Sequence, residues 1–329
     1  MFLNIYTHYV IMKQKQRGSD KQKPKVKVTL KAKEIEIKGK KVELEPLIKK
    51  VAPKFENIPK RVSEVMGVAL IIPEIEFLIF DNEGFKKYVS EIDESEYTGE
   101  ATAIYWPGRK DIAVDVSTTD KFAALFPDAE SISDIILLHV AINSMHEVAH
   151  MIDYYYDDNR FKKTENLGMK YFEGKYETEE RIKEISKKKW VDIRLRDVYD
   201  FCKLKTKYTI NKRHYFRYLR GRTLAEGIAV WTEREIFKRV GNDFRKSGDI
   251  KIAEVIEWLQ IGVHKPIEPI KNIDLSKENE HAFGYRFFEK ISQMTDANVI
   301  RLAIDYNPTY VEMLYPELYI LRMKASLLM

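Results

Sequence analysis

Apolar and polar residues alternate along the first third of the chain in the manner of β-strands. The stretch KVKVTLKAKEIEIKGKKVEL places an apolar residue at nearly every second position, which predicts a half-solvated β-hairpin or meander over residues 26–45. IEFLIFD (75–81) is a continuous apolar run typical of a buried strand. ATAIYW (101–106) and DIAVDV (111–116) flank the turn PGRK, so these two segments are expected to pair as a hairpin.

A helical pattern follows in SISDIILLHVAINSMHEVAHMIDYYY (131–156), which contains neither Gly nor Pro. Apolar residues lie almost all round this predicted helix, which indicates that it is buried. At about 100° per residue its polar residues fall in one stripe: His139, Asn143, His146, His150 and Asp153, with Glu147 at the edge. Because buried polar groups cost free energy unless they are satisfied, the stripe favours a partner such as a metal ion.

The rest of the chain is predicted to be mostly helical. Residues 157–222 are charged and aromatic, and a new helix with Thr223 as its N-cap is predicted in TLAEGIAVWTEREIFKRVG. Strands thus precede helices, so the expected fold class is α+β. The expected organisation is a disordered basic arm (1–25), the hairpin or meander (26–45), an upper subdomain with the strands and the long helix (46–156), a charged helical insertion (157–222) and a helical lower subdomain (223–329).

Composition narrows the chemistry and the partners. The 329 residues carry a net charge of only +5 and one cysteine, Cys202, so neither an intrachain disulfide nor a thiolate-rich metal site can form. No apolar run reaches the roughly 18 residues that span a bilayer, so we expect a cytoplasmic protein with no membrane partner. KRHYFRYLRGR (212–222) mixes basic and aromatic residues as nucleic-acid binders do, but a solvated basic helix face is commoner, and nucleic acid is not an expected partner.

The motif HEVAH (146–150) lies within the predicted long helix. Imidazoles at i and i+4 are one turn apart and can both reach one ion at the 2.0–2.1 Å typical of Zn–N bonds. Glu147 then lies to the side of the ion, where a base can take a proton from water. The alternative is a pair of ordinary core histidines that are hydrogen-bonded to carbonyls or carboxylates. A site without thiolates and with an open position follows the catalytic pattern of zinc proteins.

Glu226, in RTLAEGIAVWTEREIF, is the best candidate for a third ligand. Ala225, Gly227 and Ala229 around it allow another helix to approach closely. Glu233, two turns on, lies on the same face and could orient a metal-bound histidine. The alternative is that Glu226 is an exposed helical glutamate, in which case Asp153 or His139 would be tested as the third ligand.

These two motifs, HEVAH on a long helix and AEGIAVW on a later one, resemble the gluzincin metallopeptidases, the group that includes thermolysin. The resemblance covers roughly residues 60–320 in the order of elements. It implies a zincin-like fold, with a small sheet over the zinc helix, an edge strand above the cleft and a helical lower subdomain. It also implies one Zn²⁺ held by His146, His150 and Glu226, with Glu147 as the general base that activates zinc-bound water. The implied activity is hydrolysis of peptide bonds in a peptide or protein substrate.

The resemblance further implies a His or Tyr that stabilises the oxyanion. Many such peptidases carry Tyr-x-x-Gly after the glutamate helix, whereas this chain has HAFG at 281–284. His281 is the first candidate and Tyr285 the second, because residues four apart share one face of a helix expected to start near Glu278. His264 precedes Pro266 in a predicted loop and is expected to be a surface residue.

Two other functions compete with the peptidase. EVAH and ENEH (278–281) are both Glu-x-x-His motifs, and two such motifs with two further glutamates build a di-iron carboxylate oxidoreductase site in a helix bundle. A non-catalytic scaffold with a zinc site is the other alternative, although Glu147 would then have no role as a base. The sequence leaves the oligomeric state open.

Overall fold

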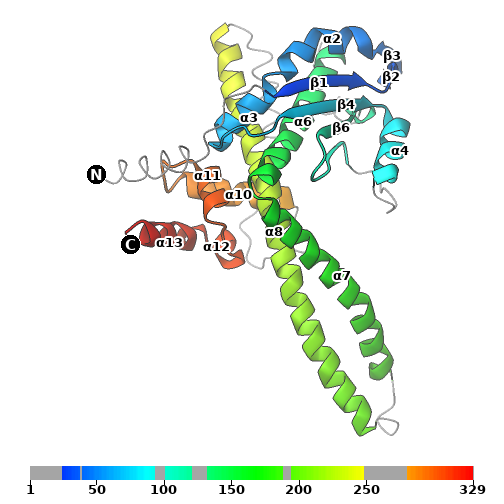
Figure 1. Ribbon diagram of the computed structural model, residues 1–329, viewed down its shortest axis with the longest axis vertical. Helices are drawn as coiled ribbons and strands as arrows, with labels where there is room; N and C mark the ends of the chain where they lie inside the picture. Colours follow the sequence, from blue (N-terminus) through cyan, green and yellow to red (C-terminus); the bar gives the residue numbers. More distant parts are fainter. Residues whose placement is uncertain are drawn as a thin grey trace.

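The computed structural model describes residues 24–37, 39–92, 101–120, 132–187, 194–247 and 280–328. Within them, a mixed four-stranded sheet in the order β1-β4-β6-β5 lies at one end of the molecule (Figure 1). β1, β4 and β6 are parallel, and β5 runs antiparallel to β6 at the edge, so the predicted hairpin is confirmed. Gly108 has φ 85° in the β5–β6 turn, a left-handed value that favours glycine. The strands are β1 (Lys25–Leu30), β4 (Glu74–Phe80), β5 (Ala103–Tyr105) and β6 (Asp111–Asp115).

The alternating N-terminal segment divides between two sheets. β2 (Glu34–Ile37) and β3 (Lys40–Glu43) form an antiparallel hairpin, as the alternation predicts. β1 does not pair with them in the structure but pairs in parallel with β4, with Lys25 opposite Glu74. The expectation of a single hairpin or meander is therefore wrong for β1. A parallel pairing needs a long crossover connection, so nothing in the local sequence indicates it.

Short helices lie on the two faces of the sheet. α2 (Leu44–Phe55) and α3 (Ile58–Met66) lead from β3 towards β4, with a break before Pro59 in the first turn of α3. α4 (Asn82–Ile92) packs its buried Phe85 and Val89 against the opposite face of β4 and β6.

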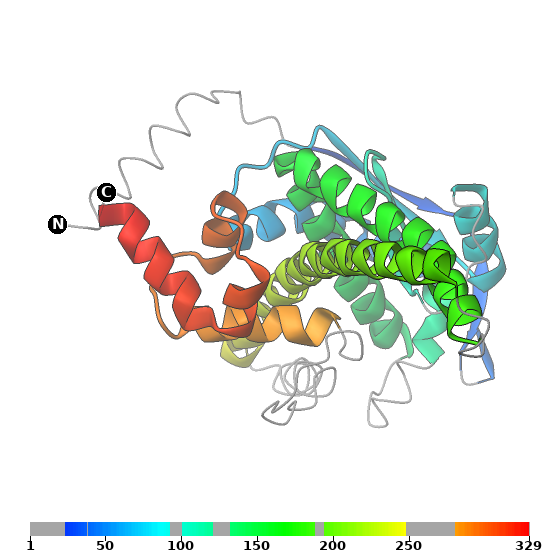
Figure 2. The same cartoon turned by 90° about the horizontal axis from the view of Figure 1, so that it is seen from below.

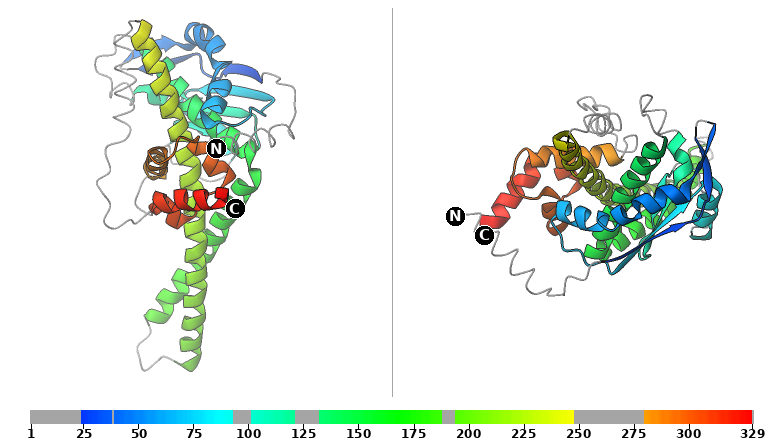
Figure 3. Two further views of the ribbon diagram at one scale, coloured as in Figure 1. Left: turned by 90° about the vertical axis from the view of Figure 1, so that its left-hand side faces the viewer. Right: turned by 90° about the horizontal axis from the view of Figure 1, so that it is seen from above.

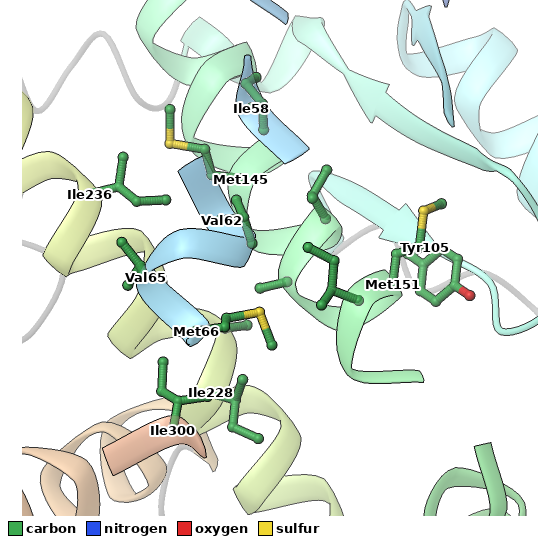
Figure 4. Close-up of a cluster of buried hydrophobic side chains, with 14 of the residues drawn as sticks. Ile58, Val62, Val65, Met66, Tyr105, Met145, Met151, Ile228, Ile236 and Ile300 are labelled. Carbon is green, nitrogen blue, oxygen red and sulfur yellow. The ribbon is translucent and has the colours of Figure 1, made fainter. Parts of the chain in front are cut away.

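The long helix α6 (Ile132–Tyr156) agrees with the predicted helix over 131–156. Most of its described apolar side chains are buried between the sheet, α3 and α8, as the all-round apolar pattern predicts, among them Ile136, Val140, Val148, Met151 and Ile152. Figure 4 shows Met145 and Met151 of α6 among Ile58 and Val62 of α3 and Ile228 of α8. The core thus joins segments that are far apart in the sequence.

Two long helices, α7 (Asp158–Ser186) and α8 (Leu195–Ser247), run side by side and project away from the sheet (Figures 1 and 3). α8 is one helix of 53 residues, so the prediction that a new helix begins at Thr223 is wrong. Thr223 is instead a buried interior residue with 1% exposure. α8 also continues through Gly221. A Cβ at this position would lie 2.3 Å from Thr164 Oγ1 of α7, so the glycine allows α7 and α8 to pack closely.

Four helices complete the described chain on the side of α8 away from the sheet (Figure 2). Phe287, Phe288 and Tyr319 are among their largest buried side chains. With strands before most helices, the class is α+β, as predicted. Among the described residues, no helix is both long enough and apolar enough to cross a membrane. The four helices are α10 (Glu280–Ser292), α11 (Val299–Asp305), α12 (Tyr310–Leu314) and α13 (Pro316–Leu328).

Candidate metal centre

The two histidines of HEVAH lie one turn apart on α6 and face the same way. Their Nε2 atoms are 3.2 Å apart, and their ring centroids are 4.8 Å apart at an interplanar angle of 75°. The side chains of His146 and His150 are 14% and 13% exposed. The two imidazole nitrogens therefore converge on one small volume at the edge of the core.

Glu226 reaches the same volume from α8. Its Oε2 lies 3.3 Å from His146 Nε2 and 3.2 Å from His150 Nε2, and the residue is 8% exposed. Glu226 lies in the middle of α8 and not in a first turn; its neighbours Ala225 and Ala229 are small and buried, and α6 packs against α8. The side chains expected to be the three metal ligands are thus brought together.

The spacing of these three atoms fits a zinc ion. Tetrahedral ligands at 2.0–2.1 Å from the metal are about 3.3–3.4 Å from one another. The three separations here are 3.2, 3.2 and 3.3 Å. Two imidazole nitrogens and one carboxylate oxygen are also a donor set that zinc accepts. The residues present therefore fit the metal that the resemblance implies.

Glu233 sets the protonation of His146. Its Oε2 lies 3.3 Å from His146 Nδ1. A carboxylate only accepts, so Nδ1 carries the proton and, in the neutral ring, Nε2 presents a lone pair. That lone pair faces Glu226 Oε2 at 3.3 Å. Two acceptors this close repel each other unless a cation lies between them, either a proton or a metal ion. The sequence-based expectation that Glu233 would orient a histidine of the motif is matched by this contact.

Electrostatics in the cluster favour bound positive charge. Burial alone would lower the pKa of His146, but its contacts with Glu226 and Glu233 and the charge of Glu147 raise it well above 6.5. Burial would raise the pKa of Glu226, but the charge of His150 and the contacts with three histidines hold it well below its ordinary value. Glu226 is therefore an ionised carboxylate, and the cluster attracts a cation.

Glu147 is held in place by the edge strand. Its Oε2 accepts the backbone N–H of Tyr105 in β5 at 2.7 Å. One turn earlier on α6, Asn143 Oδ1 accepts the hydroxyl of Thr102 at 2.8 Å. These contacts fix the polar stripe of α6 against the segment that precedes and includes β5. The Glu147 carboxylate thus has a defined orientation beside the cluster.

His281 joins the cluster from α10. Its Nε2 lies 3.0 Å from Glu226 Oε2, and its ring stacks on that of His146, with centroids 5.6 Å apart at 27°. A crossing of two glycines brings it there. A Cβ added to Gly284 would lie 2.3 Å from the carbonyl oxygen of Thr223, and one added to Gly227 would lie 2.6 Å from the backbone of Gly284. Only glycine allows α8 and α10 to approach this closely.

Tyr285, the second candidate for the oxyanion donor, points elsewhere. Its hydroxyl donates to Glu289 Oε1 at 3.3 Å, and the guanidinium of Arg234 lies 3.8 Å from its ring centroid. Tyr285 is not among the residues that line the cavity over the cluster, whereas His281 is. His264 and Glu278 lie outside the described residues.

The remaining polar residues of the α6 stripe have partners away from the three expected ligands. The ring nitrogens of His139 contact the hydroxyls of Thr119 and Thr118 at 2.7 and 3.3 Å. Burial lowers the pKa of His139 to about 4. Asp153 is fully buried and forms an ion pair with Arg160 of α7. These contacts account for both residues without a metal.

Arg222 also contacts the cluster, although the sequence pattern does not single it out. Its Nη2 lies 3.5 Å from Glu226 Oε1, and its Nε donates to Glu280 Oε2 at 3.2 Å. In the sequence Arg222 is the last residue of the basic stretch 212–222. Its position one turn before Glu226 was a signal that could have revealed the contact, because residues four apart on a helix are neighbours.

A cavity of about 1350 Å³ opens over the cluster, lined on one side by β5 and the residues around it and on the other by α7 and α8. His146, Glu147, His150, Glu226 and His281 all line it. Phe161, Met169 and Phe172 of α7 form an apolar wall, so the segment 157–222 contributes directly to the cavity.

A scan of protein-family models found no family that matches the chain, and searches of the curated proteins and of the solved structures found no similar protein.

Proposed function

We propose that this chain is a zinc-dependent metallopeptidase of the gluzincin type, with a zincin-like arrangement of sheet, motif helix and glutamate helix. The observation that carries the proposal is the mutual spacing of His146 Nε2, His150 Nε2 and Glu226 Oε2, at 3.2–3.3 Å. These distances match the edge of a zinc tetrahedron, and the atoms open onto a large cavity beside a carboxylate that does not belong to the triad.

One Zn²⁺ held by His146, His150 and Glu226 would supply Lewis acidity, which polarises a carbonyl and lowers the pKa of water. The chain supplies the rest of the chemistry. Glu147 is the general base: Tyr105 N–H holds one of its carboxylate oxygens, and the carboxylate can accept a proton from the attacking water and pass it to the leaving amine. His281 is proposed as the donor that stabilises negative charge on the carbonyl oxygen of the substrate.

The edge strand β5 supports an extended peptide as the substrate. Thr102 O accepts from Asp115 N of β6, so by alternation the backbone groups of Ala103 and Tyr105 point away from β6. Tyr105 N–H is engaged by Glu147, which leaves the N–H and C=O of Ala103 as the groups that a substrate strand would pair with. A peptide that adds to β5 would lie along the cavity over the cluster.

A peptide-library digest combined with metal analysis tests the proposal. Wild type should contain about one zinc per chain and cleave peptides. Glu147→Gln keeps the shape of the side chain but cannot act as a base, so it should retain zinc and lose about 10²–10⁴-fold in turnover. Asp158→Asn, an exposed carboxylate that pairs with Lys162 on α7, is the matched control and should leave turnover unchanged. Zinc-loaded wild type that cleaves no peptide would refute the proposal.

A non-catalytic zinc site is the second candidate, and one observation favours it. His281 brings a fourth donor to the cluster, and structural zinc sites have four protein ligands. The cavity and the orientation of Glu147 favour the peptidase. The di-iron alternative would need about four carboxylates with two histidines, whereas the described cluster offers Glu226 with three histidines around it.

A further inference from the structure

His281 differs from the other members of the cluster in its exposure. Its side chain is 44% exposed, against 14% for His146, 13% for His150 and 11% for Glu226. It therefore approaches the cluster from the solvent side. It also lies in the first turn of α10, one residue after the helix begins at Glu280.

His281 contacts the same carboxylate oxygen as the two histidines of the motif. Glu226 Oε2 lies 3.0 Å from His281 Nε2, as close as it lies to His146 and His150. Ligand atoms of His146, Glu226 and His281 all lie within 4.8 Å of one another. Three imidazole nitrogens thus contact one carboxylate oxygen, so the cluster holds one donor beyond the proposed triad, and zinc commonly takes four ligands.

We propose that His281 is a displaceable fourth ligand, which closes the metal site in the resting protein and must leave before a substrate can reach the metal. This inference rests on the proposed function. The exchange involves no oxidation or reduction: the His281 lone pair leaves the ion, and a lone pair of the incoming group takes its place. His281 Nε2 cannot bind the metal and donate a hydrogen bond at once, so it is a ligand before the exchange. Once off the metal, Nε2 takes up a proton from solvent and can then donate to the substrate.

The contacts around His281 suit a group that can leave. Arg222 joins Glu226 of α8 to Glu280, the first residue of α10, with distances of 3.5 and 3.2 Å, and its side chain is 49% exposed. Because the Arg222 side chain is half exposed, solvent screens part of its attraction to the two carboxylates. The Gly227–Gly284 crossing holds the next turn of α10 against α8, and His281 lies nearer the start of the helix, outside that contact.

Cobalt substitution of the full chain tests the inference by spectroscopy as well as by affinity. His281→Cys in a Cys202→Ser background should bind Co²⁺ through the new thiolate and show a sulfur-to-cobalt charge-transfer band. Cys202→Ser alone removes the only cysteine, which is free and exposed, and should show no such band.

His281→Ala should bind zinc at least tenfold more weakly than wild type, since loss of a partner outside the coordination shell already costs about 10–100-fold in metal affinity. It should also bind acetohydroxamate at least tenfold more tightly, because no imidazole has to leave.

His214→Ala is the matched control: this histidine lines a separate small cavity on α7 and α8, and its loss should change neither zinc nor hydroxamate affinity. Circular dichroism of each variant checks that it is folded. If folded His281→Cys binds Co²⁺ without the charge-transfer band, the inference is overturned, whatever the affinities. If wild type binds no stoichiometric metal, the proposed function fails as well. If wild type binds zinc and His281→Ala matches it in both affinities, only the inference fails.

Discussion

Gly284→Ala should weaken the metal site without changing any residue of the cluster. A Cβ at position 284 would lie 2.3 Å from the carbonyl oxygen of Thr223, whereas ordinary van der Waals contacts of Cβ lie at 3.4–4 Å. The two helices must therefore move apart by about 1 Å or more, because neither backbone can rotate out of the way as a side chain could. His281, one turn before Gly284, would be drawn away from Glu226.

The cost in stability can be worked out from the same contact. Overpacking of a close-packed interior costs about 1–3 kcal/mol, and a clash with backbone belongs at the upper end of that range. Alanine gains about 1 kcal/mol over glycine in helix propensity. The expected net loss is therefore about 2 kcal/mol in the free energy of unfolding, measured by urea denaturation of the metal-free protein.

The matched control is Ala282→Gly, which lies two residues away on α10 and reverses the exchange. It should cost only about 1 kcal/mol, the propensity term, and leave zinc affinity nearly unchanged. Gly284→Ala should also lower zinc affinity severalfold in a chelator competition, in the same direction as His281→Ala. Wild-type stability together with wild-type zinc affinity in Gly284→Ala would refute the reasoning that the glycine crossing positions His281.

The remaining predictions concern the ligands, their support and the buried histidine. His146→Ala, His150→Ala and Glu226→Ala should each lose zinc in metal analysis, because two ligands of the triad together with the displaceable His281 make a weak site; full occupancy in Glu226→Ala would remove that assignment. Glu233→Gln should lower zinc affinity about 10–100-fold by chelator competition, since it loosens the orientation of His146. The buried His139, with its pKa lowered to about 4 from 6.5, binds no proton in the folded state until the pH falls near 4. The unfolded chain binds one below 6.5, so up to about 3 kcal/mol of stability should be lost as the pH falls from 6.5 to 4. Denaturation of His139→Gln across this range should lack that loss, and an unchanged pH dependence would contradict it.

The elements that the sequence predicts well are those with strong local periodicity. The apolar pattern of α6, uninterrupted by Gly or Pro, predicts both its extent and its burial. The turn PGRK between two apolar segments predicts the β5–β6 hairpin. The two-turn separation of Glu226 and Glu233 places both on one helix face, and this holds whether a helix starts at Thr223 or passes through it.

What the sequence did not predict depends on contacts between distant segments. β1 finds its partner 49 positions along the chain, across a connection with its own hairpin and helices. At Gly221 and Thr223 the local signals favour a helix boundary, but packing against α7 carries α8 through both. The approach of His281 to Glu226 depends on the pairing of Gly227 with Gly284, and neither glycine alone indicates a partner.

X-ray absorption at the zinc edge of the loaded wild-type protein reports the metal's ligands themselves. The proposed site should give nitrogen and oxygen ligands at about 2.0–2.1 Å in a four-coordinate shell, with the outer scattering of at least two imidazoles. Glu147→Gln should give the same spectrum, because Glu147 is not a ligand. A sulfur ligand at about 2.3 Å, or a shell without imidazole scattering, would contradict the assignment of His146, His150 and Glu226 as the metal site.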